Sequence, residues 1–420
     1  MSSPLLTRIA AEHAAALAVQ PAGSPTLAHR RSALQRLLAR GLPTGRDENW
    51  RYANLRALEK ANFLPATAVA AADLSLPAPI EGFARLVFID GQFAPQLSAS
   101  AEALESATVS RLLGELPTED QAFALLNEAF ATDGADIRVA PGTAPVDIEV
   151  LFCSSSPLAA YPRLNVQLAP RARLRLIDRH VGSAGAAQFI NSAVRIAAAE
   201  GASCSHYRLQ ECGPAATWTD TLRAVIARDA AYHLHLLHLG ALSARSSIDI
   251  ELAGPAARTR IDTVSLADGQ QVHDTMVVVD HKAAHTRTDE NFRGIAGGRA
   301  RIAFNGLIIV RDTAQHADSA QSLKGLIAGS DAEIDLRPQL EIHTDEVRCS
   351  HGATTGKLDE AMLFYLLTRG IEPEVAQRLL KWAFITDVVA HIDVPALRTH
   401  VQRSLASHMQ DAQSLEELLS

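Results

Sequence analysis

Short apolar strands recur along the middle of this chain at a nearly constant spacing, and this spacing constrains the fold more than any other feature. The residues that mark successive strands, at intervals of 28, 30, 26 and 27, are Leu168, Ile196, Ile226, Leu252 and Val279. No helical pattern of the length that a βαβ unit needs separates these strands. A parallel β-solenoid stacks each coil on the next at such a period. We therefore predict a solenoid, with a β-sandwich as the alternative.

Alternation within the segments supports the strand assignment. In residues 171–176, arginines alternate with Ala172, Leu174 and Leu176. Successive side chains of a strand point to opposite faces, so this segment is expected to bury one face and expose its charges.

Helical periodicity at both ends divides the chain into three regions. Residues 1–135 read as a helical and mixed N-terminal region, and residues 136–352 as the β core. Residues 353–420 read as a C-terminal domain of three short helices. The apolar stripe expected on the third helix is Leu397, Val401 and Leu405. The predicted fold class is therefore mainly β with helical ends.

Composition argues against several classes of protein. The formal charge is −8, which gives no basic face for nucleic acid. No apolar run approaches the roughly 20 residues of a membrane span. Arg8, Glu12 and His13 interrupt the N-terminal apolar positions, unlike a signal peptide. The cysteines are too few and too scattered for a disulfide framework: Cys153, Cys204, Cys212 and Cys349. We expect a cytoplasmic protein.

The run from residue 338 to residue 371 carries the main candidate chemistry. Cys349 and His351 are two residues apart, so they point to the same side if the chain is extended. Gly352 is expected to end the strand, and an amphipathic helix follows within a few residues. A thiol and an imidazole at the end of a rigid sheet suit a transient metal or sulfur site.

Two other motifs imitate binding sites. His233, His235 and His238 have metal-like spacing, but His238 should point away from the other two, and no Cys or acid lies at ligand spacing. An exposed β ladder is the preferred interpretation over a zinc site. The segment from Gly352 to Leu358 resembles a P-loop that is one residue short and carries Leu where Ser or Thr should bind Mg²⁺. Nucleotide binding is not expected there.

The run 338–371 resembles the SufD branch of the SufB/SufD family, scaffold proteins of iron–sulfur cluster assembly. The motif Glu48-Asn-Trp-Arg-Tyr52 is similar to a run near the start of such proteins, and the resemblance covers the chain end to end. It implies a right-handed parallel β-helix core and a non-enzymatic scaffold. Such a scaffold pairs with a SufB-like subunit through the β-helix ends, and each subunit binds one SufC-like ATPase.

The resemblance also implies roles for individual residues. By motif match, His351 would be a transient iron or cluster ligand at the junction with the partner, and Cys349 would lie beside it. The main sulfur-acceptor cysteine would belong to the SufB-like partner. No stably bound cofactor is implied in this chain. A reduced flavin in the complex stays open, although no flavin fingerprint is visible.

In the family the C-terminal helical domain also docks the ATPase. Our candidates for that surface are Leu363, Tyr365, Leu379, Trp382 and Phe384. The same apolar stripes also serve to cap the solenoid, and Trp382 suits either role. Two further classes stay open. One is a β-helix carbohydrate-active enzyme, which the lack of a clustered carboxylate motif disfavours. The other is a homodimeric structural protein joined by β edges.

Overall fold

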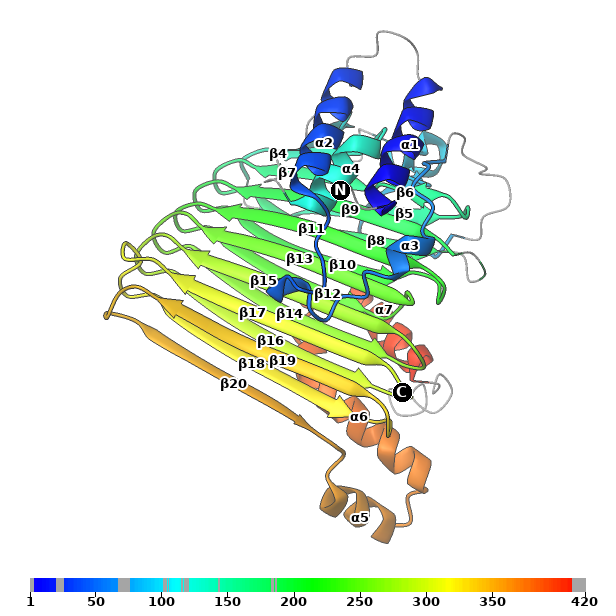
Figure 1. Cartoon of the computed structure of the whole chain (residues 1–420). Coiled ribbons are helices and arrows are strands. Elements are labelled where there is room, and N and C mark those ends of the chain that lie inside the picture. Colours follow the sequence, from blue (N-terminus) through cyan, green and yellow to red (C-terminus); the bar gives the residue numbers. More distant parts are fainter. Residues whose placement is uncertain are drawn as a thin grey trace.

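A parallel β-solenoid forms the centre of the molecule (Figure 1). The computed structural model describes residues 4–19, 26–66, 76–100, 104, 106–114, 116, 121–142, 144–182, 185 and 187–409. Within these residues two ten-stranded sheets face each other, and through the solenoid the chain alternates between them. This confirms the predicted fold class. The last part of the predicted C-terminal domain, 410–420, lies outside the described residues.

Sheet 1 is parallel except where β2 joins β1. In spatial order its strands are β2 (Gln92–Phe93), β1 (Ala84–Ile89), β5 (Val146–Ser154), β8 (Arg173–Gly182), β10 (Ser203–Glu211), β12 (Ala231–His238), β14 (Arg258–Ala267), β16 (Arg287–Ala296), β18 (Asp318–Ile327) and β20 (Arg348–Gly356).

Sheet 2 is parallel except where β3 joins β4. In spatial order its strands are β19 (Glu333–Ile342), β17 (Arg301–Val310), β15 (Val272–His281), β13 (Ser243–Leu252), β11 (Thr217–Ile226), β9 (Phe189–Ala198), β7 (Arg163–Leu168), β4 (Ala135–Val139) and β3 (Ala107–Arg111), with β6 (Ala159–Ala160) also beside β9.

The strand register confirms the spacing on which the solenoid was predicted. The five marker residues fall on the consecutive sheet 2 strands β7, β9, β11, β13 and β15. One register line joins Leu168, Ala198, Ile226, Leu252 and His281. By subtraction of these numbers, successive coils measure 30, 28, 26 and 29 residues.

In several coils, a residue with a left-handed backbone conformation lies at the corner between a strand of sheet 2 and the next strand of sheet 1. Residues with φ between 55° and 63° are Arg171, Asp229, Ala256, His285 and His316. For residues other than glycine this conformation costs roughly 1–2 kcal/mol each, so the stacking of coils must stabilise it. The prediction that Arg171 belongs to the following strand is wrong, because β8 begins only at Arg173.

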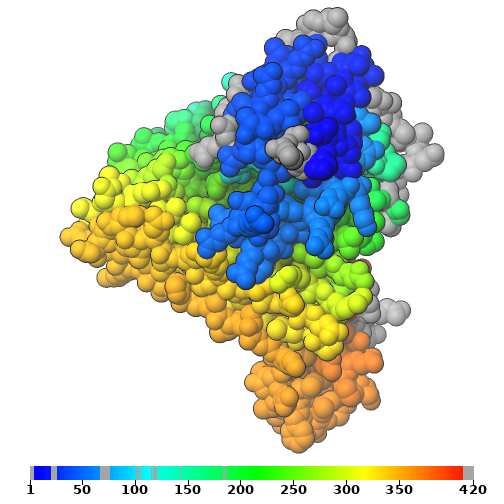
Figure 2. Space-filling model, in the orientation of Figure 1, coloured from blue at the N-terminus to red at the C-terminus, as the bar shows by residue number. Residues whose placement is uncertain are grey.

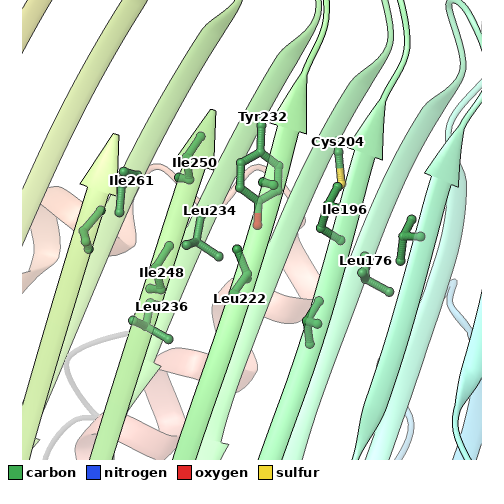
Figure 3. Close-up of a cluster of buried hydrophobic side chains, with 14 of the residues drawn as sticks. Leu176, Ile196, Cys204, Leu222, Tyr232, Leu234, Leu236, Ile248, Ile250 and Ile261 are labelled. Atoms are coloured by element: carbon green, nitrogen blue, oxygen red, sulfur yellow. The ribbon is translucent and has the colours of Figure 1, made fainter. Parts of the chain in front are cut away.

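Apolar side chains fill the space between the sheets (Figure 3). Leu222 and Ile248 are in register on β11 and β13 and are at most 1% exposed. Ala172, Leu174 and Leu176 are also buried, as their alternation predicted. Each coil thus covers the apolar face of the one before it, and burial of this kind contributes about 25 cal/mol per Å² of apolar surface.

Helices cover the end of the solenoid where the chain begins (Figure 1). They are α1 (Pro4–Ala18), α2 (Leu27–Arg40), α3 (Ala57–Lys60), η2 (Pro95–Leu97) and α4 (Ala122–Phe130), whereas η1 (Glu48–Trp50) lies over the outer face of sheet 2. Trp50 stacks on Phe123 with ring centroids 5.1 Å apart, and the guanidinium of Arg245 lies 4.4 Å from the Trp50 ring. The aromatic segment after α2 therefore packs against α4 and against β13 of sheet 2.

Three helices follow the last strand: α5 (Glu360–Thr368), α6 (Pro373–Val389) and α7 (Pro395–His408). α6 and α7 cover the outer face of sheet 1, where Leu397, Val401 and Leu405 pack in a cluster with Tyr207 and Val264. The predicted stripe of the third helix is confirmed, since its three residues are fully buried. Among the described residues, none of the helices is long and apolar enough to cross a membrane.

Candidate functional site

The solenoid ends at β20, the strand that carries Cys349 and His351. β20 pairs with β18 on one side, and within the described chain no strand pairs with its other edge. The expectation that Gly352 ends the strand is wrong, because the ladder with β18 continues to Gly356. Backbone pairing along a complete neighbouring strand outweighs the weak strand preference of one glycine.

Cys349 and His351 face the interior of the solenoid at its open end. Cys349 is in register with Ser319, and His351 with Gln321. Both β18 residues are buried, at 1% and 4% exposure, and parallel partners in register share a face. The prediction that the thiol and the imidazole point to one side is confirmed. Cys349 is half-buried against the core, whereas His351 is exposed because no further coil of the described chain covers it.

A buried acid lies on the same register line, two strands behind His351. The line runs from Glu290 through Gln321 to His351. Gln321 Nε2 donates to Glu290 Oε2 at 2.5 Å and to the carbonyl oxygen of Gly306 at 3.0 Å. A Cβ at Gly306 would overlap both side chains, so glycine is needed there.

The environment of Glu290 favours the protonated form of its carboxyl group. Burial raises the pKa of Glu290 to about 7, although the hydrogen bond from Gln321 opposes the shift. Sequence reasoning did not connect either residue with His351. The signal that could have found them is the coil length. Gln321 follows Glu290 by one coil in the sequence, and His351 follows Gln321 by one more.

α5 projects from the open end of the solenoid and exposes an apolar surface (Figures 1 and 2). None of its residues is buried. The exposed fractions are 57% for Met362, 67% for Phe364, 57% for Tyr365 and 37% for Leu367. Large apolar side chains grouped on one short helix are typical of an interaction surface.

The five residues expected at the docking surface divide into two groups. Tyr365 is exposed and Leu363 is half-buried on α5, while Leu379, Trp382 and Phe384 are half-buried on α6. Trp382 and Phe384 pack partly against the cluster that joins α6 and α7 to sheet 1. Sequence reasoning missed Met362, Phe364 and Leu367, which are also exposed apolar residues of α5.

The remaining cysteines are buried in the β-solenoid. Burial raises the pKa of Cys153 to about 11 and of Cys204 to about 12, and it also raises the pKa of Cys212. Thiolates are the reactive form of cysteine, so these three are packing residues, whereas Cys349 reaches the surface of the open end. The segment that imitates a P-loop is extended in β20 from Gly352 to Gly356, unlike a loop that surrounds phosphates.

The histidines of β12 lie on both sides of sheet 1. His238 is inside the solenoid, within 3.1 Å of Ser246 Oγ, as the alternation predicted. His233 and His235 face the other way, but the expected exposed ladder is wrong, because His235 is only 6% exposed. The expectation that no acid lies near these histidines is also wrong. Asp262 of the next coil pairs in register with His235.

Comparison with known proteins identifies the family. Residues 151–384 match the model of the SUF system FeS cluster assembly, SufBD core domain. The chain is 30% identical to the iron–sulfur cluster assembly protein SufD of Escherichia coli K12, over 88% of this chain and 89% of that protein. The chain belongs to the SufBD family of iron–sulfur cluster assembly proteins.

More distant relatives agree with this assignment. The SufBD family protein slr0076 of Synechocystis sp. PCC 6803 is 27% identical, over 87% of each chain. The SufBD family protein ML0594 of Mycobacterium leprae is 25% identical, over 85% of this chain and 88% of that protein. The matched core spans β5 to α6, so family membership and the solenoid describe the same part of the molecule.

Proposed function

We propose that this chain is a SufD-type scaffold subunit that acts in the cytoplasm without catalysing a reaction itself. It pairs with a SufB-like subunit through the open end of its solenoid and binds a SufC-like ATPase through its C-terminal helices. An iron–sulfur cluster is then assembled as cargo at the junction, with His351 as a transient ligand and Cys349 beside it. The observation that carries the proposal is that both side chains lie on the terminal strand, at the one end of the solenoid that the described helices leave open.

The backbone of β20 supports pairing through this edge. The Arg348 N–H donates to the carbonyl oxygen of Ala317, the residue just before β18, at 2.9 Å. In a parallel ladder every second residue bonds to the same neighbour. The N–H groups of Cys349, His351 and Ala353 therefore point to the free edge. An unpaired edge is a template for a strand from another chain, so pairing there would bring a partner next to the thiol and the imidazole.

The apolar surface of α5 supports docking of the second partner. Met362, Phe364 and Tyr365 contribute little to packing within the subunit, because each side chain is more than half exposed. α5 follows β20 after a short connection. A movement of a partner bound to α5 would therefore reach the terminal strand directly, which is the coupling that an ATP-driven scaffold needs. Family membership favours this function over a carbohydrate-active enzyme.

Copurification of tagged chain with its native partners tests the proposal, and two variants separate its parts. Ala353→Pro removes an edge N–H without removing a bond to β18, so it should reduce recovery of the SufB-like subunit and leave the ATPase bound. Phe364→Asp places a charge on the α5 surface and should release the ATPase while the SufB-like subunit is retained.

Leu113→Asp is the matched control, because Leu113 is a 46% exposed apolar residue of the N-terminal region. It should change neither interaction. Recovery of only a second copy of this chain would support the homodimeric alternative instead. Full recovery of both partners with Ala353→Pro and Phe364→Asp would place the two interfaces elsewhere.

A further inference from the structure

A second group of metal-ligand side chains lies on the outer face of sheet 1, away from β20. It consists of His233 and His235 on β12 and Asp262 on β14. One donor atom from each residue lies within 4.8 Å of the donor atoms of the other two. His233 Nε2 is 2.8 Å and His235 Nδ1 is 4.0 Å from the same oxygen, Asp262 Oδ2.

These separations are close to those of a bound metal ion. Zinc and similar ions hold nitrogen and oxygen ligands at about 2.0–2.2 Å in tetrahedral geometry, which places the donor atoms about 3.3 Å apart. Small side-chain rotations would bring the three donors to that spacing. The parallel ladder makes the arrangement rigid, because His235 and Asp262 are in register on adjacent strands.

The surroundings of the three residues also favour a ligand. His235 is only 6% exposed, so the rest of the protein restricts the position of its ring. Asn291 Nδ2 donates to Asp262 Oδ1 at 2.9 Å, which orients the carboxylate and leaves Oδ2 for the shared site. Outer hydrogen bonds of this kind are typical of metal ligands.

We propose that His233, His235 and Asp262 form a binding site for a divalent transition-metal ion of the Fe²⁺, Co²⁺ or Zn²⁺ class. Two imidazoles and one carboxylate leave coordination positions open, and this ligand set is typical of both iron(II) and zinc sites. The site is distinct from the junction at β20, because it faces α6 and α7 on the outside of sheet 1.

Two neighbouring side chains would affect a bound ion. Arg260 would compete with it, and His391 would lie beside it. Arg260 Nε donates to Asp262 Oδ2 at 3.0 Å, so the guanidinium occupies part of the space for a cation. Its side chain is 37% exposed, and it can turn toward solvent when an ion binds. His391, just after α6, has Nδ1 3.1 Å from Asp262 Oδ2. A bound ion would therefore lie where α6 ends against the sheet and would fasten the C-terminal helices.

Titration of chelator-treated, full-length protein with Co²⁺ tests the proposal, because Co²⁺ bound by imidazole and carboxylate absorbs visible light. We expect one Co²⁺ per chain in this site, displaced by Zn²⁺, and a rise of the melting temperature on binding. Asp262→Asn and His233→Gln should each weaken binding by about tenfold or more. Arg260→Gln should strengthen it, since a competing cation is removed.

Two controls keep the result specific. His343→Gln changes an exposed histidine elsewhere, and His351→Ala changes the junction; both should retain the Co²⁺ spectrum. His233 is partly exposed, so His233→Gln is expected to fold even if Asp262→Asn does not. The absence of a Co²⁺ band in the wild-type chain, or a band that persists in folded Asp262→Asn and His233→Gln, would overturn the proposal. Loss of the band in His351→Ala would assign the ion to the junction.

Discussion

Glu290 provides the sharpest test of the solenoid interior, because its carboxyl group is buried and, among the described residues, its hydrogen-bond donor is the Gln321 amide. Burial raises its pKa from 4.5 to about 7. A carboxyl group with a higher pKa in the folded protein binds its proton more tightly there, so stability is lost as the pH rises from about 4.5 to about 7. At 1.36 kcal/mol per pH unit, the full loss is about 3 kcal/mol.

We expect Glu290→Gln to remove this loss, because glutamine keeps the size of the side chain and cannot ionise. Integration of the proton linkage gives a cost of about 1 kcal/mol at about pH 5.5 and about 3 kcal/mol at about pH 8. The variant should therefore gain about 2 kcal/mol relative to the wild type between these two pH values. Urea unfolding followed by circular dichroism measures the difference.

The matched control is Glu333→Gln, since Glu333 is an exposed glutamate on β19. Its difference from the wild type should change little over the same pH range. The reasoning about Glu290 is refuted if the Glu290→Gln difference is independent of pH, or if the wild type gains stability relative to the variant as the pH rises.

Three further predictions concern the rest of the chain. His351→Ala should change the free energy of unfolding by less than about 0.5 kcal/mol, because the side chain is exposed, yet fail to support cluster assembly in a complementation assay; full complementation would contradict the ligand role. Leu405→Ala, at a fully buried position of α7, should cost about 2–5 kcal/mol, measured by urea unfolding; a cost near zero would mean that α7 does not stabilise sheet 1. The isolated chain should not bind ATP in calorimetric titration, because Gly352–Gly356 is extended, and binding that persists after removal of contaminating ATPase would contradict this.

The solenoid was predictable because its period is present in the sequence as well as in the structure. Each coil repeats the same alternation, so markers such as Ile226 and Leu252 align in register. The shared side of Cys349 and His351 was also predictable, because it depends only on the two-residue period of a strand. The roles predicted for Cys349, His351 and the docking residues stay predictions.

Features that depend on register between coils were not predictable from local pattern. Asp262 lies 27 residues after His235 in the sequence but directly beside it in the sheet. A search for ligands at short spacing around the histidines therefore missed it. The end of β20 was also misjudged at Gly352, because the length of a terminal strand depends on its neighbour β18 rather than on its own sequence.

The register line that ends at His351 explains how one structural position can serve either stability or function. Its last four members are Ile261, Glu290, Gln321 and His351. The first three are buried because another coil covers them, so a polar group there is costly, as the raised pKa of Glu290 indicates. His351 has the same inward orientation without that cost, since no coil of the described chain follows β20. If a partner strand covered this edge, as we propose, His351 would become as enclosed as Gln321 is now. Exclusion of water would then strengthen the binding of a metal ion by the imidazole, because charges interact more strongly at low dielectric. A ligand that is complete only within the assembled pair would confine cluster formation to the junction.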